Sequence, residues 1–496
     1  MVRKLSKFII LVILFDQQVW SQSKSSDFLK RWELNPQEVS KEIPHKKGSQ
    51  YILKFSKKDI RDEKYIDQKD EVKLEQCKLA GFENCVDSFN PFEFSHDGYN
   101  IQRFIGRVPE INLYQLDKYK VGAARVTPWS GYFWPFNKGG IGVRYGDSQF
   151  PNSSEFLDNF KYYERNYSKK PQSIGNLDNL SPAEKYDLLT EDSDWTLTYN
   201  SWAVGRRFYQ LNGKVDKWMG ICHGWAPAAI VIPEPTKSFR VNLPRLGKSV
   251  QFFPDDIKAL VSQQWASARV TSVMIGGRCG VRKPQSDENG RIISSDCFDT
   301  NPASWHLALV NLLGKYGESF VFDATYDFEV WNQPISSYSL NYFNPNTKEI
   351  SSSLQASVIP YSYYNNDLFS KYRSPLTKNI VGVELKLKYV VESRPEQISG
   401  VTESQPLEEE VTYYYDLELD DSNNIIGGEW YQKAHPDLMW KPIVKRPVVF
   451  GEPSFEVWSG IMPIPFDISA FAKTSAKTNQ PINAILETLI SLSHAQ

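Results

Sequence analysis

The chain has 496 residues, with 57 Lys and Arg against 59 Asp and Glu, so its formal net charge at pH 7 is −2. This balance leaves no excess of positive charge for phosphates and argues against a nucleic-acid-binding protein. Hydrophobic residues make up 41% and charged residues 23%, which is ordinary globular composition and excludes a chain that is disordered throughout.

The first 21 residues have the pattern of a secretory signal peptide. Arg3, Lys4 and Lys7 precede a short apolar run, Phe8–Phe15, and small residues follow near position 21. The run is too short to span a bilayer, and no later stretch approaches ~18 apolar residues. We therefore expect a secreted protein without a membrane span in its mature form, extracellular or, in a bacterium, periplasmic or at the cell surface.

Secretion affects how the five cysteines are interpreted, because thiols outside the cytosol tend to pair. Cys77 and Cys85 are close in sequence, as are Cys279 and Cys297. Proximity predicts these two disulfides, although spacing alone leaves other connectivities open. Cys222 then remains as a single thiol, which is an intermolecular partner, an inert residue or a nucleophile.

We expect four regions after the signal peptide. Residues 22–100 are polar and could be a pro-segment, residues 101–360 form the catalytic region, residues 361–475 form a β-rich C-terminal region, and residues 476–496 are a tail.

Two local patterns predict particular elements. SPAEKYDLL predicts a helix that starts at Pro182, with Ser181 as its cap and Glu184 completing a capping box. Further on, VTYYYDLELDD and IIGGEWY alternate as strands do and predict a hairpin that turns over Asp421–Asn424.

Cys222 lies in GICHGWAPAA, and the small residues after it predict a short helix. A thiol at a helix N-terminus faces the positive end of the helix dipole, which lowers its pKa and favours the nucleophilic thiolate. Pro227 would interrupt a helix that began at His223, so we expect a start near Gly224 or a distorted first turn.

A thiolate nucleophile needs a base, and His306 is the best placed of the six histidines. Two apolar runs, SWHLALVNLLG and ESFVFDAT, predict a hairpin centred between Gly314 and Lys315. This register sets His306 opposite Asp323, with Cβ atoms roughly 4.5–5.5 Å apart, and a one-residue slip would separate them. Each residue alone also fits a structural role, but Cys222, His306 and Asp323 together predict a catalytic triad.

These residues resemble the papain-like transglutaminase core and, more specifically, the transglutaminase elicitor family of oomycete plant pathogens, which also has bacterial members. The segments that carry the resemblance are TPWSGYFWP (127–135), SPAEKYD (181–187), GICHGWAPAA (220–229), SWHLALVNLLG (304–314), EVWNQP (329–334) and GGEWYQKAHPDLMW (427–440). EVWNQP matches the start of the peptide by which plants recognise these enzymes, but the ISSYSLNY that follows it departs from the family pattern. Ser130 stands where a proline is expected.

The resemblance implies protein-glutamine γ-glutamyltransferase activity on proteins that carry glutamine and lysine. It implies an α+β fold in which the nucleophile Cys222 starts a helix that packs on an antiparallel sheet carrying the base His306 and the carboxylate Asp323. A monomer is favoured. Candidates for the walls of an acceptor channel, or for an indole N–H aimed at the oxyanion, are Trp129, Trp134, Trp225 and Trp305.

The resemblance also suggests a response to calcium, which prefers six to eight oxygen ligands. We favour Asp296 and Asp299, beside the predicted Cys279–Cys297 loop, over a second acidic segment; both also fit solvated turns. The second segment contains Asp416, Glu418, Asp420 and Asp421.

Two other functions remain open at this point. Thiol, imidazole and carboxylate chemistry is shared with cysteine proteases and amidases. A catalytically inactive secreted binding protein would instead use the aromatic side chains, 14% of the chain, to hold polymers or partner proteins.

Overall fold

The structure is a computed structural model that describes residues 96–167, 174–277, 300–324, 329–402, 405–432, 435–456, 458–461 and 463–494, together with residues 28–32, 34, 35, 39, 285 and 287. Several predictions lie outside these residues: the signal peptide at 1–21, most of the polar segment at 22–100, the four cysteines expected to pair, and the calcium candidates Asp296 and Asp299.

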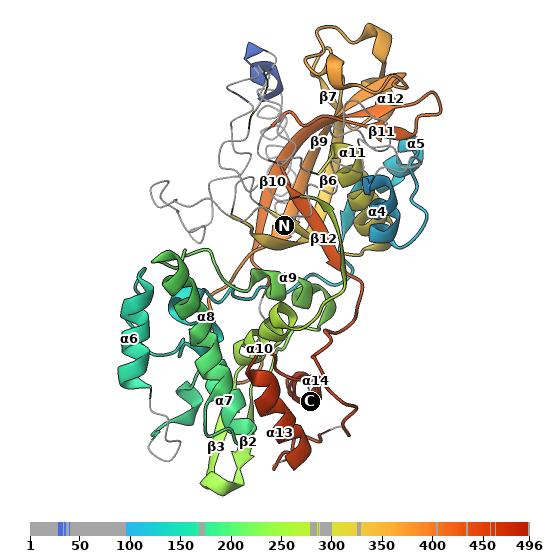
Figure 1. Ribbon diagram of the computed structural model, residues 1–496. Coiled ribbons are helices and arrows are strands. Elements are labelled where there is room, and N and C mark those ends of the chain that lie inside the picture. Colours follow the sequence, from blue (N-terminus) through green and yellow to red (C-terminus); the bar gives the residue numbers. More distant parts are fainter. Residues whose placement is uncertain are drawn as a thin grey trace, which may run out of the picture.

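The molecule has a helical half and a sheet half, with the helix that carries Cys222 between them (Figure 1). The helices are α4 (His96–Ile105), α5 (Leu113–Leu116), α6 (Phe156–Asn166), α7 (Pro182–Leu189), α8 (Thr196–Asn212), α9 (Cys222–Val231), α10 (Pro254–Ser267), α11 (Pro302–Ala308), α12 (Leu354–Ser357), α13 (Phe466–Ala476) and α14 (Asn483–Leu492). Helices α6–α10, α13 and α14 build the helical half, whereas α4, α5 and α11 flank the sheet.

The sheet is antiparallel and curled, with the strand order β11-β10-β9-β6-β5-β12-β4. Its strands are β1 (Val121–Ala123), β4 (Ser272–Gly276), β5 (Val321–Asp323), β6 (Asn332–Phe343), β7 (Ile350–Ser351), β8 (Ile359–Pro360), β9 (Asn379–Val390), β10 (Glu408–Leu419), β11 (Ile425–Gly427) and β12 (Leu438–Pro442). A separate ribbon of β2 (Phe239–Leu243) and β3 (Lys248–Phe252) lies in the helical half. Strands from the predicted catalytic and β-rich regions thus share one sheet.

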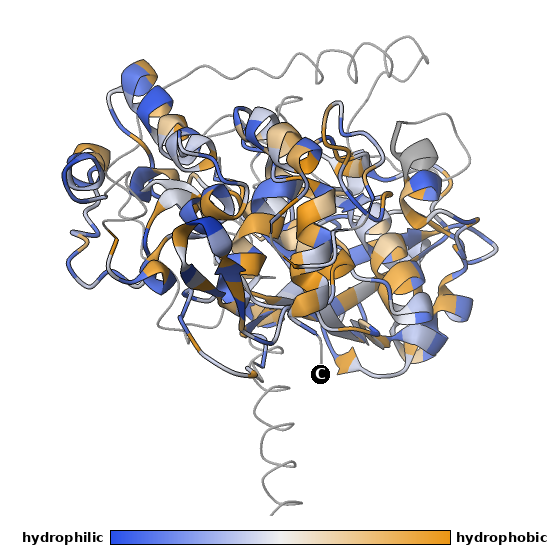
Figure 2. Ribbon diagram, turned by 90° about the horizontal axis from the view of Figure 1, so that it is seen from below, coloured by the Kyte–Doolittle hydropathy of each residue, from blue (hydrophilic) through white to orange (hydrophobic). Residues whose placement is uncertain are grey.

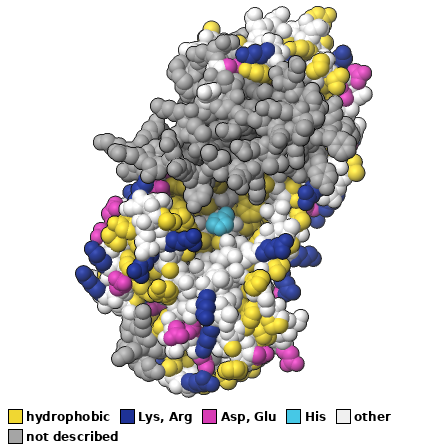
Figure 3. Space-filling view, in the orientation of Figure 1, with side chains coloured by type: hydrophobic (Ala, Val, Ile, Leu, Met, Phe, Trp, Pro, Cys, Tyr) yellow, Lys and Arg dark blue, Asp and Glu magenta, His cyan; other side chains and the backbone are white. Residues whose placement is uncertain are grey.

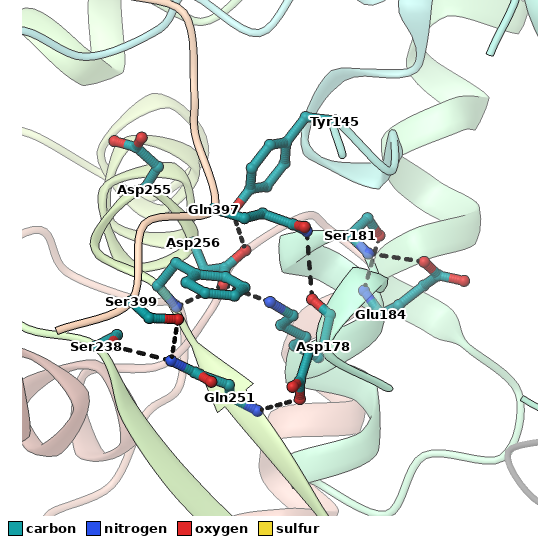
Figure 4. Close-up of polar contacts among 12 residues, drawn as sticks. Tyr145, Asp178, Ser181, Glu184, Ser238, Gln251, Asp255, Asp256, Gln397 and Ser399 are labelled. Atoms are coloured by element: carbon teal, nitrogen blue, oxygen red, sulfur yellow. Dashed lines mark hydrogen bonds and ion pairs between the residues drawn. The ribbon is translucent and has the colours of Figure 1, made fainter. Parts of the chain in front are cut away.

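Both local predictions are confirmed. Ser181 Oγ accepts from the Glu184 N–H at 3.1 Å and Glu184 Oε2 accepts from the Ser181 N–H at 2.8 Å, so the predicted capping box starts α7 (Figure 4). The turn between β10 and β11 closes where it was expected, with the Asn423 N–H donating to the Asp420 carbonyl at 3.1 Å.

The hairpin predicted between His306 and Asp323 is wrong. Residues 302–308 form α11, and a π-helical turn, Leu309–Gly314, continues it. Every residue from Pro302 to Leu313 is buried, and an apolar run buried on all sides has no period that separates helix from strand. The neglected signal was Asn301, whose side chain caps the helix ahead of a proline at its first position.

The protein has two main hydrophobic cores. The first surrounds α9 and α10 and includes Cys222, and the second fills the space between the sheet, α4 and α11. Figure 2 shows the most hydrophobic stretches gathered in the middle of the molecule. On the face in Figure 3, basic and acidic side chains are interspersed, as the balanced net charge leads one to expect.

The connection between β9 and β10, residues 391–407, reaches from the sheet half to the helical half, and we call it the β9–β10 loop. Gln397 Nε2 donates to the Asp178 carbonyl at 3.3 Å, and Gln251 Nε2 donates to Ser399 Oγ at 3.1 Å (Figure 4). The two halves are therefore held together by hydrogen bonds to this loop.

Ser130, at the position where the family pattern suggests proline, anchors the end of the same loop. Its hydroxyl accepts from the Leu407 N–H at 2.8 Å, which a proline side chain cannot do. The Ser130 carbonyl also accepts from Lys258 Nζ at 3.1 Å.

A fully buried ion pair between α7 and α10 gives a test of this arrangement. Lys185 Nζ lies 2.6 Å from Asp256 Oδ2, and neither side chain is exposed. Lys185→Met should lower the free energy of unfolding by about 3–5 kcal/mol, because it leaves a buried carboxylate without its cation. Urea denaturation followed by circular dichroism measures the loss.

The matched control is Lys214→Met, which removes the cation from a half-exposed pair with Asp216. An exposed pair contributes about 1 kcal/mol or less. Equal losses in the two variants would contradict the role given to the buried pair.

Candidate active site

Close packing of α9 fixes the position of Cys222. A Cβ atom on Gly224 would lie 2.1 Å from the Ser262 carbonyl oxygen on α10, so only glycine allows this approach. The Ile221 N–H, just before the helix, donates to the Phe133 carbonyl at 2.6 Å. The helix begins at Cys222 itself and contains Pro227, so the expected start near Gly224 is wrong; the alternative, a distorted first turn, fits the Gly224 N–H, which donates to the Ile221 carbonyl three residues back at 2.9 Å.

The thiol of Cys222 lies against the start of β6. Its sulphur is 3.5 Å from Asn332 Nδ2 and 3.7 Å from the Val330 carbonyl oxygen. Asn332 Oδ1 accepts from Trp440 Nε1 at 2.7 Å, which orients the amide so that its N–H groups face the sulphur. An amide donor in this place could bind the oxyanion that forms when a thiolate attacks a carbonyl group.

Asp323 lies in the same neighbourhood. It pairs with Asn332 across β5 and β6, and its Oδ1 accepts from the Trp331 N–H at 2.9 Å. Its negative charge also contributes to raising the pKa of Cys222. The structure therefore brings together two of the three residues of the predicted triad.

His306 lies elsewhere. Its Nδ1 is 2.9 Å from the Tyr415 hydroxyl, and no hydrogen bond joins it to Cys222 or Asp323 in the part of the chain that the structure describes. The adjacent Trp305 packs against Phe322 in the sheet-side core, whereas Cys222 belongs to the other core. Complete burial lowers the pKa of His306 to about 3, so its imidazole is neutral at pH 7.

The pKa of the Cys222 thiol is raised, whereas its place at a helix N-terminus predicts a lowered pKa. Burial raises the pKa of Cys222 to about 11, although the hydrogen bond from Asn332 acts in the opposite direction. Only 5% of the residue is exposed, so removing the thiolate from water outweighs the effect of the helix dipole. In this arrangement Cys222 is a protonated thiol at neutral pH.

The four candidate tryptophans are all buried. The indole N–H of Trp129 donates to the Ile232 carbonyl at 2.9 Å, and that of Trp225 donates to the Trp129 carbonyl at 3.2 Å. Both indole N–H groups therefore already donate to backbone carbonyls. Trp134 packs edge-on against Tyr132, and Trp305 lies in the sheet-side core.

The residues that do contact the sulphur were missed by residue-level reasoning. Asn332 and Val330 both belong to EVWNQP, a segment that the family resemblance contains but that carries no recognisable catalytic motif of its own. That segment follows Asp323 closely in the sequence, and this proximity was the available signal.

The calcium candidates differ in what the structure says about them. Asp296 and Asp299 lie outside the described residues. In the second segment, Arg373 pairs with Asp416 at 2.5 Å and lies 3.5 Å from Glu418, so these carboxylates face a cation. Within the described ranges there is no group of three or more His, Cys, Asp or Glu placed to hold a metal ion.

A mixed fold of this kind, with helices packed on a curled antiparallel sheet, is found in transglutaminases. A model of the transglutaminase elicitor family matches residues 97–449, and the chain belongs to that family. Its fold is similar to that of the GP42 transglutaminase from Phytophthora sojae, known from a crystal structure, with a TM-score of 0.51 and 23% sequence identity. The similarity covers 81% of this chain and 98% of that one. No curated protein matches the chain.

The raised thiol pKa predicts how Cys222 reacts with iodoacetamide. Because only the thiolate reacts, the alkylation rate of the folded protein should rise about tenfold per pH unit from pH 6 to about 10. Mass spectrometry of the Cys222 peptide after timed alkylation measures this rate. A rate that reaches a plateau below pH 7 would instead show a thiolate–imidazolium pair and contradict the arrangement described above.

Proposed function

We propose that this protein is a secreted protein-glutamine γ-glutamyltransferase that uses Cys222 as its nucleophile. The observation that carries the proposal is the thiol at the start of α9, with the Asn332 amide at 3.5 Å. Membership of the transglutaminase elicitor family supports the reaction type. Secretion rests on the signal-peptide pattern of residues 1–21; among the described residues, no helix is long and apolar enough to cross a membrane.

The reaction proceeds in two steps. The sulphur of Cys222 attacks the side-chain carboxamide carbon of a protein-bound glutamine, the C–N bond breaks, and ammonia leaves as a thioester forms. The amine of a lysine then attacks the thioester carbon, and the C–S bond breaks to give an isopeptide bond and the free thiol. In both steps the carbonyl oxygen becomes negative, and the Asn332 amide is placed to stabilise it.

The proton on the thiol must be removed before attack. Asp323, predicted as the carboxylate of the triad rather than as its base, is near enough to the sulphur for its charge to act on the pKa of Cys222. His306 would have to leave Tyr415 and cross from the other core to serve as the base. We therefore assign the proton acceptor to Asp323 and give His306 a structural role.

Labelled-amine incorporation into casein tests the nucleophile. Cys222→Ala and Cys222→Ser should each abolish incorporation while the circular dichroism spectrum stays native, because both side chains fit the space of the thiol. Retained transfer above a few per cent would exclude Cys222. Release of peptides that depends on Cys222, without amine incorporation, would identify a protease or amidase, and no thiol-dependent reaction at all would favour a binding protein.

A comparison of Asp323→Asn with His306→Ala tests the acid–base assignment. Asp323→Asn keeps the acceptor for the Trp331 N–H but removes a negative charge, so the pKa of Cys222 should fall, alkylation at pH 8 should quicken, and amine transfer should drop at least tenfold. Parallel alkylation and transfer assays measure both effects.

His306→Ala should act differently. It removes a buried partner of the Tyr415 hydroxyl and should cost about 2–4 kcal/mol of stability, with alkylation of Cys222 unchanged in the folded protein. If His306→Ala slowed alkylation and left the melting temperature unchanged, imidazole would be the base after all.

A further inference from the structure

A second carboxyl group, that of Glu392, lies beside the candidate active site. Glu392 follows the end of β9, between two backbone hydrogen bonds: the Val391 N–H donates to the Leu407 carbonyl at 2.8 Å, and the Ser393 N–H donates to the Gly131 carbonyl at 2.7 Å. The chain is thus held on both sides of Glu392, and the side chain has a defined place.

Gln333 connects Glu392 to the residues around the thiol. It follows Asn332 on β6, and its Nε2 donates to Glu392 Oε1 at 2.9 Å. Burial is the main cause that raises the pKa of Cys222 and of Tyr132, and the charge of Glu392 adds to both; at Tyr132 the Arg394 cation acts more strongly in the opposite direction. The carboxyl group therefore acts electrostatically on the reacting sulphur.

Glu392 has no ion-pair partner among the described residues. Two other buried carboxylates have one, Asp256 with Lys185 at 2.6 Å and Asp416 with Arg373 at 2.5 Å, whereas Asp187 is held by hydrogen bonds from Leu197 and Thr198. Glu392 as a whole is partly buried. Burial raises its pKa to about 7, against the hydrogen bond from Gln333.

One hydrogen-bond acceptor beside Glu392, the side-chain oxygen of Gln333, lacks a donor in the part of the chain that the structure describes. Gln333 is 4% exposed, and its Oε1 has no hydrogen-bond partner among the described residues. Turning the amide over would set that oxygen against the Glu392 carboxylate, so the observed orientation is the favourable one. Two acceptors therefore lie next to each other, and a primary ammonium group, which carries three donors and no acceptor, matches them.

Aromatic rings line the same region. Phe133 packs edge-on against Tyr132 with ring centroids 5.1 Å apart and against Trp331 with centroids 5.2 Å apart. Tyr132 and Trp331 are both partly exposed. The methylene stem of a lysine side chain packs well against surfaces of this kind.

We propose that Glu392 is the residue that selects the acceptor substrate, by binding the ammonium group of a lysine or another cationic primary amine beside the Cys222 thioester. This inference rests on the proposed transferase activity of Cys222. Gln333 orients the carboxylate and supplies its free oxygen as a second acceptor for the ammonium group.

Attack of the acceptor amine on the Cys222 thioester needs no reactant other than the amine and the thioester. One proton moves from the ammonium group to the Glu392 carboxylate, and the resulting amine forms a bond to the thioester carbon. The C–S bond breaks, the second amine proton goes to the sulphur, and the product is an isopeptide bond with a free thiol. Glu392 then returns its proton to water.

The test compares two nucleophiles, cadaverine, which is cationic at pH 7.5, and hydroxylamine, which is mostly uncharged. In Glu392→Gln the amide keeps the shape of the side chain but loses the charge. Transfer to cadaverine should fall at least ~10-fold through a higher KM, whereas transfer to hydroxylamine should change less than ~2-fold. The ratio of the two rates cancels any change in the pKa of Cys222, because both reactions use the same thioester.

Glu396→Gln is the matched control, since it removes the same charge from an exposed position of the β9–β10 loop and should leave both rates unchanged. Glu392→Asp should restore part of the preference for cadaverine. Equal losses with both nucleophiles in Glu392→Gln, or no loss with either, would overturn the inference. If the wild-type protein transferred neither nucleophile, the proposed function itself would fail.

Discussion

The candidate active site depends on the burial of one sulphur atom between two cores. Helix α9 packs so closely on α10 that Gly224 touches the backbone of Ser262, and the opposite side of its first turn meets the start of β6. Because α9 belongs to the helical half and β6 to the sheet half, the place of the thiol is set by how the two halves meet. Residues far apart in sequence, Cys222 and Asn332, become neighbours only through this contact.

The charged groups that act on that sulphur are carboxylates rather than cations. Burial disfavours the thiolate most and the hydrogen bonds from Asn332 oppose it, while the charges of Glu392 and Asp323 add smaller effects in the same direction as burial. An environment of this kind keeps the thiol uncharged at neutral pH. The same environment suits a cationic second substrate, because its ammonium group neutralises the negative charge of the Asp323 and Glu392 carboxylates.

The parts of the fold that the sequence predicts well are those that local residues determine. The capping box of α7 needs only Ser181 and Glu184, and the turn before β11 needs only a short polar stretch between alternating strands. The helix around His306 was missed because a completely buried apolar run carries no periodicity. The short helix at Cys222 was predictable from the small residues that follow it, whereas the contact of its thiol with Asn332 depends on long-range packing that residue-level patterns do not contain.

The backbone anchors on either side of Glu392 have a consequence for how this protein can diverge. The bonds at Val391 and Ser393 use main-chain atoms, so they persist whatever side chain stands between them. A single codon change at position 392 could therefore alter the charge of the site while the loop and the junction of the two halves keep their geometry. Relatives with the same scaffold are free to acquire different acceptor preferences through this one position, without a compensating change elsewhere in the core.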